Sequence, residues 1–279
     1  MADEYILRID GPDETGLVHK ITGVLYYHGL NVVRNDEYVD REHGQFFMRT
    51  EFSGTANPDK IISGLKGILP NYANVALTTR QVKDVVILVT KEHHCLSDLL
   101  IRYAYGELPM QIKAVIGNHQ VLESLAARFN VPFHYVPHND LSREAHEARI
   151  METIGTYRPD YLVLAKFMRV LTPAFTRQYA NRIINIHHSF LPAFIGANPY
   201  RQAHQRGVKI IGATAHFVSD DLDEGPIITQ DVIHINHSKS APQMAMAGKD
   251  VEKVVLAKAL KLVLEDRVFI YGNRTIIFE

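Results

Sequence analysis

The sequence has little of what marks a secreted or membrane-embedded protein. It contains one cysteine, Cys95, so an intrachain disulfide is impossible and a reducing compartment is the natural setting. The first ten residues, MADEYILRID, lack the basic and apolar regions of a signal peptide, and we expect none. No stretch approaches the roughly 18 uninterrupted apolar residues of a membrane span. We therefore expect a cytoplasmic protein with no membrane partner.

An excess of charge of one sign is also absent. The formal net charge is -1, with 30 Lys and Arg against 31 Asp and Glu, whereas a nucleic-acid-coating surface needs a strong basic excess. The 15 histidines include close pairs, but none has cysteine neighbours at zinc-finger spacing or forms an HExxH pattern. We therefore expect neither a nucleic-acid partner nor a bound metal.

Residues 1–81 have the pattern of a small α+β domain. Residues 5–10 alternate apolar and polar side chains, as a half-buried strand does, and apolar side chains at helical spacing follow from Leu17. A hairpin, a short helix and a closing strand are expected next, over residues 31–52, 57–67 and 75–79. The resulting order, β-α-β-β-α-β, predicts a ferredoxin-like domain.

Residues 82–279 change to the pattern of an α/β domain. The segment 84–90, DVVILVT, is a continuous apolar run, which is typical of a strand covered on both faces in a parallel sheet. The same type of run recurs at 112–116 and 161–165, with helical stretches between, which predicts a doubly wound, Rossmann-like and mostly parallel sheet. A closing amphipathic helix and a final hairpin are expected over residues 248–266 and 267–278.

Two segments of this second domain carry polar residues suited to catalysis, NIHHSFLPAFIGANPY from Asn185 and GATAHFVSDDLDEGPIITQD from Gly212. Asn185 and His187 follow the start of an apolar strand and, being two residues apart, point to the same side of it. Because ligands bind at the carboxyl ends of such strands, the pair could stabilise a carbonyl oxygen that becomes anionic. Asp223 could hold a water or set the protonation of His187. The residues alone leave open that its acidic loop is a solvated turn.

These segments and LAKFMRVLTPAF (164–175) resemble the folate-dependent formyltransferase fold, shared by glycinamide ribonucleotide formyltransferase and methionyl-tRNA formyltransferase. The resemblance covers residues 82–279 and implies that Asn185, His187 and Asp223 are the catalytic residues. It implies no cofactor, because the reduced folate is itself the substrate. The residues that it places around that substrate are Phe167, Met168, Arg169, Val170, Leu171, His216, Asp220 and Gly225. From the residues alone, His216 reads as a structural histidine beside the site.

The N-terminal domain, with its PDETG turn and the segment LVHKITGVLYYHGLNV, resembles an ACT domain. ACT domains are regulatory modules that usually bind amino acids between paired copies. The resemblance implies an amino-acid effector as a candidate partner and a homo-oligomer, either a dimer or a tetramer. A purely structural role in oligomerisation stays open. The order of the two domains resembles the formyltetrahydrofolate deformylases from end to end.

The choice between hydrolysis and transfer depends on the loop after the first strand of the second domain. This loop, TKEHHCLSDLL (90–100), has no glycine through which backbone amides could approach an acceptor phosphate, and Glu92 would repel one. The tRNA enzymes carry a further C-terminal barrel, for which we expect no room before Glu279. We therefore expect hydrolysis of 10-formyltetrahydrofolate to tetrahydrofolate and formate, in the context of purine biosynthesis. Transfer of the formyl group to a small acceptor, and a non-catalytic folate or amino-acid sensor, remain the alternatives.

Two further residues bear on this choice. His188 stands where formyl-transferring relatives usually have proline (NIHPS), and deformylases of this type read NIHHS, so the change fits hydrolysis. Cys95 could act as a nucleophile, but no base partner is evident in the sequence. We favour the interpretation that Cys95 is a small buried residue in the first turn of a helix.

Overall fold

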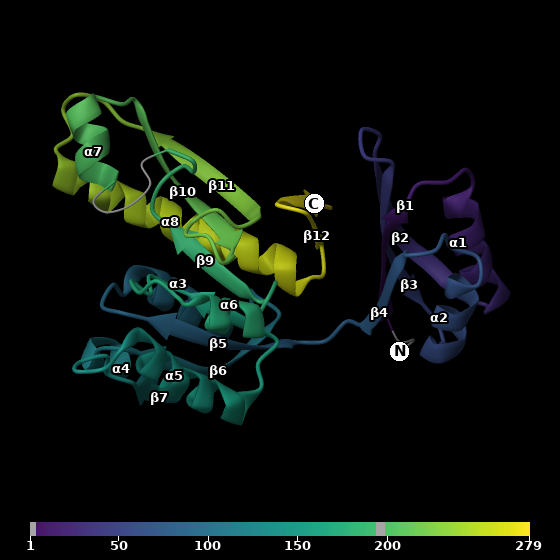
Figure 1. Cartoon of the computed structure of the whole chain (residues 1–279), viewed down its shortest axis with the longest axis horizontal. Coiled ribbons are helices and arrows are strands. Elements are labelled where there is room, and N and C mark those ends of the chain that lie inside the picture. The colour runs from purple at the N-terminus through teal and green to yellow at the C-terminus, as the bar shows by residue number, and fades with distance from the viewer. Residues whose placement is uncertain (1–3, 194–198) are drawn as a thin grey trace. The chain divides into compact units, whose positions relative to one another are not determined.

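The computed structural model describes residues 4–193 and 199–279, which form two compact units (Figure 1). The first unit contains the chain up to Gln81 and two C-terminal segments, Glu265–Phe269 and Ile276–Glu279. The second contains the remaining residues, Val82–Leu264 and Ile270–Thr275. With the expected boundary between residues 81 and 82, all residues after 81 would belong to the second unit. In the structure, Glu265–Phe269 and Ile276–Glu279 belong to the first unit instead.

The first unit is a four-stranded antiparallel sheet in the order β2-β3-β1-β4, packed against two helices. Its elements are β1 (Glu4–Pro12), α1 (Leu17–Tyr27), β2 (Asn31–Asp40), β3 (Gln45–Ser53), α2 (Pro58–Lys66) and β4 (Asn74–Thr79). The predicted β-α-β-β-α-β order is confirmed. Alternate residues of β1, among them Leu7 and Ile9, pack with Ile21 and Leu25 of α1, so the core lies between the sheet and the helices.

The two C-terminal segments belong to the first unit because they pack on the face of its sheet that points away from the helices. Side chains alternate along β3, so Phe46 and Met48 enter the core, whereas Phe47 and Arg49 point to the opposite face. There the ring of Phe47 packs edge-on against that of Phe269, with 5.8 Å between ring centroids. The sequence could not show this, since the partners lie more than two hundred residues apart.

The second unit is built on a seven-stranded sheet in the order β11-β10-β9-β8-β5-β6-β7. Its strands are β5 (Lys83–Val89), β6 (Met110–Gly117), β7 (Phe133–Tyr135), β8 (Tyr161–Leu164), β9 (Ile183–His187), β10 (Ile210–Phe217) and β11 (Ile227–His234). The four strand pairs β9-β8, β8-β5, β5-β6 and β6-β7 are parallel. At the other edge of the sheet, β10 pairs antiparallel with β9, and β11 pairs antiparallel with β10. The predicted Rossmann-like, mostly parallel sheet is confirmed.

Helices connect and cover these strands (Figure 1). They are α3 (His94–Ala104), η1 (Gln120–Leu122), α4 (Glu123–Ala127), α5 (Arg143–Tyr157), α6 (Pro173–Gln178), α7 (Pro199–Arg206) and α8 (Ala241–Leu264), and a hairpin of β12 (Val268–Tyr271) and β13 (Arg274–Ile277) ends the chain. The helix expected over 248–266 is α8, which begins earlier, at Ala241. Its first turn is part of a hydrophobic core, because Met244 packs with Ile211 and Ile235. None of the described helices combines the length and apolar character needed to span a membrane.

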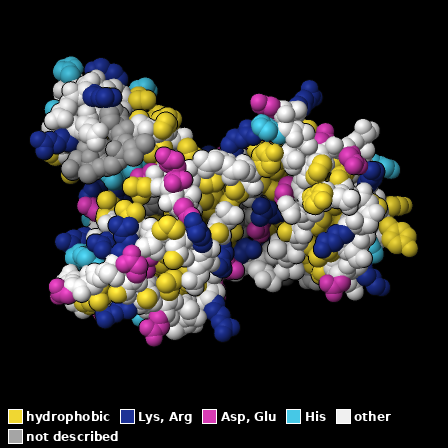
Figure 2. All heavy atoms as spheres, in the orientation of Figure 1, with side chains coloured by type: hydrophobic (Ala, Val, Ile, Leu, Met, Phe, Trp, Pro, Cys, Tyr) yellow, Lys and Arg dark blue, Asp and Glu magenta, His cyan; other side chains and the backbone are white. Residues whose placement is uncertain are grey.

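The charged side chains of both units are mixed in sign. On the face shown in Figure 2, Lys and Arg lie among Asp and Glu over each unit, in line with the net charge of -1. This face therefore lacks the continuous positive patch that attracts a polyanion such as a nucleic acid.

Candidate active site

The second unit contains a cavity of about 1030 Å³, walled in part by the loops that follow β5, β8 and β9. β5 lies between β6 and β8, so successive connections leave this region of the sheet in opposite directions. Such a switch point, at the carboxyl ends of the strands, is where open α/β sheets bind ligands. The cavity is therefore in the place where this fold supports chemistry.

Most of the predicted site residues line this cavity. They are Asn185, His187 and Asp223 together with Phe167, Met168, Arg169, Val170, Leu171, His216 and Asp220. Gly225 was also expected at the substrate, but it is not part of the cavity wall. Residues 194–198, within the segment that begins at Asn185, lie outside the described residues.

His187 and Asp223 form a buried pair. The Nδ1 atom of His187, at the end of β9, lies 3.2 Å from Oδ1 of Asp223. Burial alone would raise the pKa of Asp223, but the hydrogen bond and the charges of the neighbouring histidines outweigh it and lower the pKa below its ordinary value. Asp223 is thus an anion that accepts a hydrogen bond from Nδ1–H of His187. The other nitrogen of His187, Nε2, has no hydrogen-bond partner in the described part of the chain, so it is the atom left to act on a ligand.

Asn185 is oriented by a second histidine. The antiparallel pairing of β9 with β10 places Asn185 opposite His216, and Asn185 Nδ2 lies 3.2 Å from His216 Nε2. Burial lowers the pKa of His216, and its Nδ1 lies 2.8 Å from the carbonyl oxygen of Phe217. A neutral imidazole that donates from Nδ1 accepts at Nε2, so it receives one amide hydrogen of Asn185. The second amide hydrogen remains for a ligand oxygen.

The loop that carries Asp223 is held against β10 by a close backbone approach. Asp223 has a left-handed backbone with φ 58°, a conformation that aspartate tolerates better than most residues. Two residues later, a Cβ atom on Gly225 would overlap with the carbonyl oxygen of Phe217. Gly225 therefore lets the loop reach β10, and its contact with the substrate stays a prediction.

Gly225→Ala is accordingly expected to lower kcat/KM by about 100-fold, since a displacement of a catalytic group by ~1 Å has an effect of that size. The added methyl forces the loop away from Phe217 and moves Asp223 from His187. Gly155→Ala is the matched control, because no atom lies within 4 Å of its Cβ position on α5. Steady-state kinetics of both variants test the effect. Equal activity of the two would contradict this role for Gly225.

The loop after β8 forms the apolar part of the wall. Met168 and Val170 are 57% and 46% exposed and line the cavity. The hydroxyl of Thr90 accepts the backbone N–H of Met168 and fixes the loop to the end of β5. Asp220 is bound by Thr176 and by Arg177 Nε at 2.8 Å, so its carboxylate fastens its loop to α6. This part of the wall offers apolar surface to a ligand.

A second polar group, which the sequence analysis did not single out as a group, lies in the same cavity. Glu252 on α8 is 1% exposed and accepts hydrogen bonds from His94 Nε2 and Tyr200 Oη, both at 2.8 Å, while Lys166 Nζ lies 3.2 Å away. Burial would raise the pKa of Glu252, but these partners lower it to about 2. We call these residues the Glu252 cluster: His94, Lys166, Tyr200 and Glu252. The one available signal was a carboxylate on the buried face of a helix.

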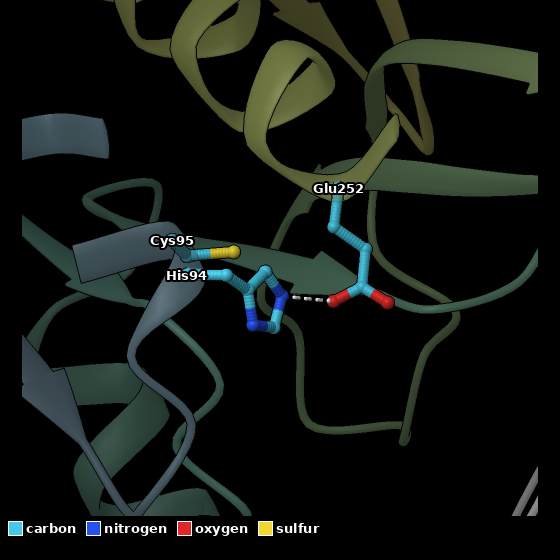
Figure 3. A group of neighbouring side chains, drawn as sticks. All are labelled: His94, Cys95 and Glu252. Atoms are coloured by element: carbon cyan, nitrogen blue, oxygen red, sulfur yellow. Dashed lines mark hydrogen bonds and ion pairs between the residues drawn. The ribbon is translucent and has the colours of Figure 1, made fainter. Parts of the chain in front are cut away.

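Among the described residues, one group could hold a metal ion: His94, Cys95 and Glu252 (Figure 3). Their possible ligand atoms lie within 4.8 Å of one another. Burial and the charge of Glu252 raise the pKa of Cys95, so its thiol stays protonated. The carboxylate is already bound to His94 and paired with Lys166. The donor set therefore suits an internal ion-pair network better than a metal, and the same raised pKa argues against Cys95 as a nucleophile.

His188 lies between the two polar groups. Its ring stacks on that of His187, with 5.1 Å between centroids, and its centroid is 6.0 Å from that of Tyr200. Burial, and next the charge of Lys166, lower the pKa of His188 to about 4, so the imidazole is neutral near neutral pH.

Comparison with known proteins places both units among characterised families. A Formyl transferase family model matches residues 83–260, and an ACT domain model matches residues 5–69. A formyltetrahydrofolate deformylase from Haemophilus influenzae is 54% identical over 99% of this chain and 100% of that protein. The crystal structure of a formyltetrahydrofolate deformylase from Pseudomonas syringae pv. tomato covers 100% of this chain and 95% of that one, with a TM-score of 0.96 and 39% identity. A glycinamide ribonucleotide transformylase from Symbiobacterium toebii covers 74% of this chain and 98% of that one, with a TM-score of 0.68 and 30% identity.

Proposed function

The chain belongs to the formyltetrahydrofolate deformylase family, and from this premise we propose that its cavity hydrolyses 10-formyltetrahydrofolate through Asn185, His187 and Asp223. The products are tetrahydrofolate and formate. One observation supports these residue roles. The side chains of His187 and Asn185 line the same cavity, and each is held by a hydrogen bond to a neighbouring side chain. Asp223 fixes His187, and His216 fixes Asn185.

The chemistry follows from what these groups can do. Water adds its oxygen to the formyl carbon, and the C=O electron pair moves onto the formyl oxygen. The amide of Asn185 and the Nε2–H of a protonated His187 donate to that oxygen as it becomes anionic. The Asp223 carboxylate accepts a hydrogen bond from Nδ1 of His187 and holds the ring in place, with Nε2 left to act on the substrate. The attacking water gives up two protons: one is transferred to N10 as the C–N10 bond breaks, and the other is released as the product leaves as formate. No oxidant, reductant or further cofactor is required.

The folate occupies the apolar part of the wall in this proposal. Its pterin is flat and has donor and acceptor edges, which suit the slot between the 167–171 loop and the loop of Asp220 to Asp223. The exposed side chains of Met168 and Val170 would be covered on binding. The substrate is thus the organic ligand of the site.

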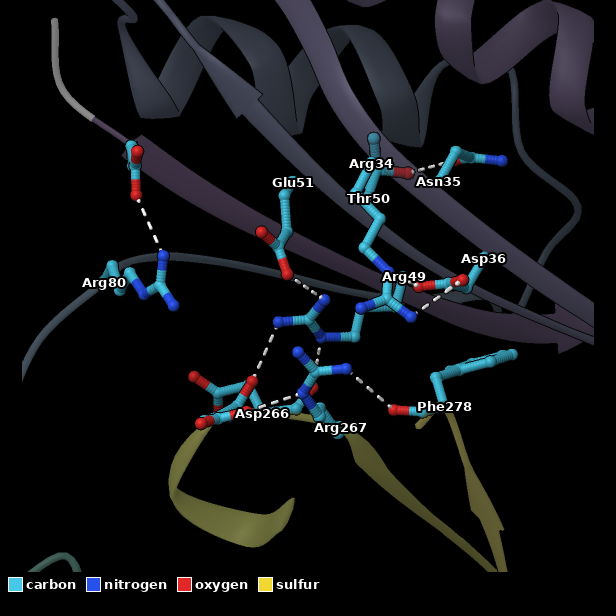
Figure 4. Close-up of polar contacts among 12 residues, drawn as sticks. Arg34, Asn35, Asp36, Arg49, Thr50, Glu51, Arg80, Asp266, Arg267 and Phe278 are labelled. Atoms are coloured by element: carbon cyan, nitrogen blue, oxygen red, sulfur yellow. Dashed lines mark hydrogen bonds and ion pairs between the residues drawn. The ribbon is translucent and has the colours of Figure 1, made fainter. Parts of the chain in front are cut away.

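For the first unit we propose a regulatory role in which paired copies of the ACT domain bind an amino-acid effector, within a dimer or tetramer in the cytoplasm. The match to the ACT model supports the ligand class. One face of the sheet is already occupied in this chain, because Arg49 donates to the carbonyl oxygens of Asp266 at 3.0 Å and Glu265 at 2.9 Å (Figure 4). Arg8 also donates to Val268. Pairing between copies would therefore use the strand edges or the helices.

The test of the activity is formate release by the purified protein from 10-formyltetrahydrofolate with no added acceptor. We expect formate and tetrahydrofolate in a ratio of about one to one, as hydrolysis requires. Tight folate binding without formate would contradict hydrolysis. It would favour the second candidate, transfer to an acceptor, and direct the search to the loop between Thr90 and Cys95.

A further inference from the structure

The cavity must admit a second reactant besides the folate. In hydrolysis that reactant is water, whereas a formyltransferase of the same fold admits a larger acceptor. Contacts run from His187 to His188 and from His188 to Tyr200, with ring centroids 5.1 and 6.0 Å apart. Tyr200 then donates to Glu252 at 2.8 Å. The Glu252 cluster thus begins one side chain beyond His187 and lines the same cavity.

Three separate segments meet on the Glu252 carboxylate. His94 opens α3, Tyr200 lies in the first turn of α7, and Glu252 is within α8. A Cβ atom on Gly248, one turn before Glu252, would overlap with the phenol of Tyr200, so the ring lies directly on the helix backbone. His94 and Glu252 are 5% and 1% exposed. His94, Tyr200 and Glu252 therefore occupy the space at this end of the cavity.

Both lysines that line this region are paired with a glutamate. Lys166 pairs with Glu252 at 3.2 Å, and Lys249 pairs with Glu92 at 2.6 Å. An acceptor phosphate or carboxylate that binds either lysine would have to break its ion pair, and at Lys166 it would also approach the buried Glu252 carboxylate. Breaking the buried pair of Lys166 and Glu252 leaves an uncompensated charge, which is strongly unfavourable.

We propose that His94 and Tyr200, both held by Glu252, are specificity-determining residues that fill the acceptor side of the cavity and restrict the second reactant to water. This inference rests on the proposed hydrolysis and adds to it the reason why transfer does not compete. Removal of both side chains should open room for a small amine beside the formyl carbon.

The test uses the full-length double variant His94→Ala/Tyr200→Ala with 10-formyltetrahydrofolate and glycinamide as the probe acceptor. The measured quantity is the ratio of N-formylglycinamide to formate, corrected for the reaction without protein. We expect the ratio to rise by roughly tenfold or more over wild type, the scale on which steric fit discriminates small substrates. Tyr200→Phe is the matched control, because its ring still fills the space, and its ratio should stay near that of the wild type.

The outcomes separate this proposal from the underlying one. Absence of formate from the wild-type protein would overturn hydrolysis itself. If the wild type releases formate and the double variant binds folate normally, an unchanged product ratio overturns the role of His94 and Tyr200 alone. Should the double variant fail to fold, as judged by circular dichroism, Tyr200→Ser is measured in the same way. An unchanged ratio in that folded variant would overturn the proposal equally.

Discussion

Asp223→Asn is expected to lower kcat for formate release by about 10³- to 10⁴-fold while changing the folate Kd by less than about threefold. The amide has the shape of the carboxylate but no charge, so it cannot compensate positive charge on His187 in the transition state. It can also present a donor to Nδ1, which selects the wrong tautomer. Stopped-flow kinetics and folate titration of the variant give the two numbers. Hydrolysis near the wild-type rate would show that Asp223 is not part of the reacting group.

The same carboxylate makes the stability of the fold depend on pH in the acidic range only. The pKa of Asp223 is lowered in the folded protein, so its interaction with His187 stabilises the fold above the ordinary aspartate pKa. That stabilisation is lost as the pH falls through the lowered, folded-state pKa. Asp223 itself therefore stays ionised through the neutral and mildly acidic range. A loss of activity around neutral pH would have to come from another group.

The fold was predictable where local periodicity decides it. The β-α-β-β-α-β order and the apolar parallel strands follow from side-chain spacing, because each strand must bury one or two faces. The placement of the C-terminal segments was not predictable. Arg49 is 1% exposed only because it binds the carbonyl oxygens of Glu265 and Asp266, and no local pattern signals such a distant partner.

For the site, the sequence was informative about neighbours along one strand. Asn185 and His187 are two apart on β9, and this spacing alone predicts a shared side. The link from Asn185 to His216 depends on the register between β9 and β10, which a single sequence does not specify. Glu252 was missed because its place on the buried face of a long helix does not show that its carboxylate reaches a cavity.

Asn185→Ala is expected to lower kcat by about 10²- to 10³-fold with little change in KM, the usual effect of removing one donor to an oxyanion. The reason is that the amide donates most strongly to the formyl oxygen once that oxygen is negatively charged, so the loss appears in the transition state. Steady-state kinetics separate the two parameters. A rise in KM with an unchanged kcat would mean that Asn185 binds the folate without acting on the developing charge.

The double variant Asn185→Ala/Asp223→Asn tests whether the two residues act on the same oxygen. If His187, held by Asp223, and Asn185 both donate to one oxyanion, the combined loss should be clearly smaller than the product of the single losses. Once one donor is removed, the oxygen can shift or bind water, and the second donor then contributes less. Strict multiplication of the two effects would instead place Asn185 and the His187–Asp223 pair on different steps of the reaction.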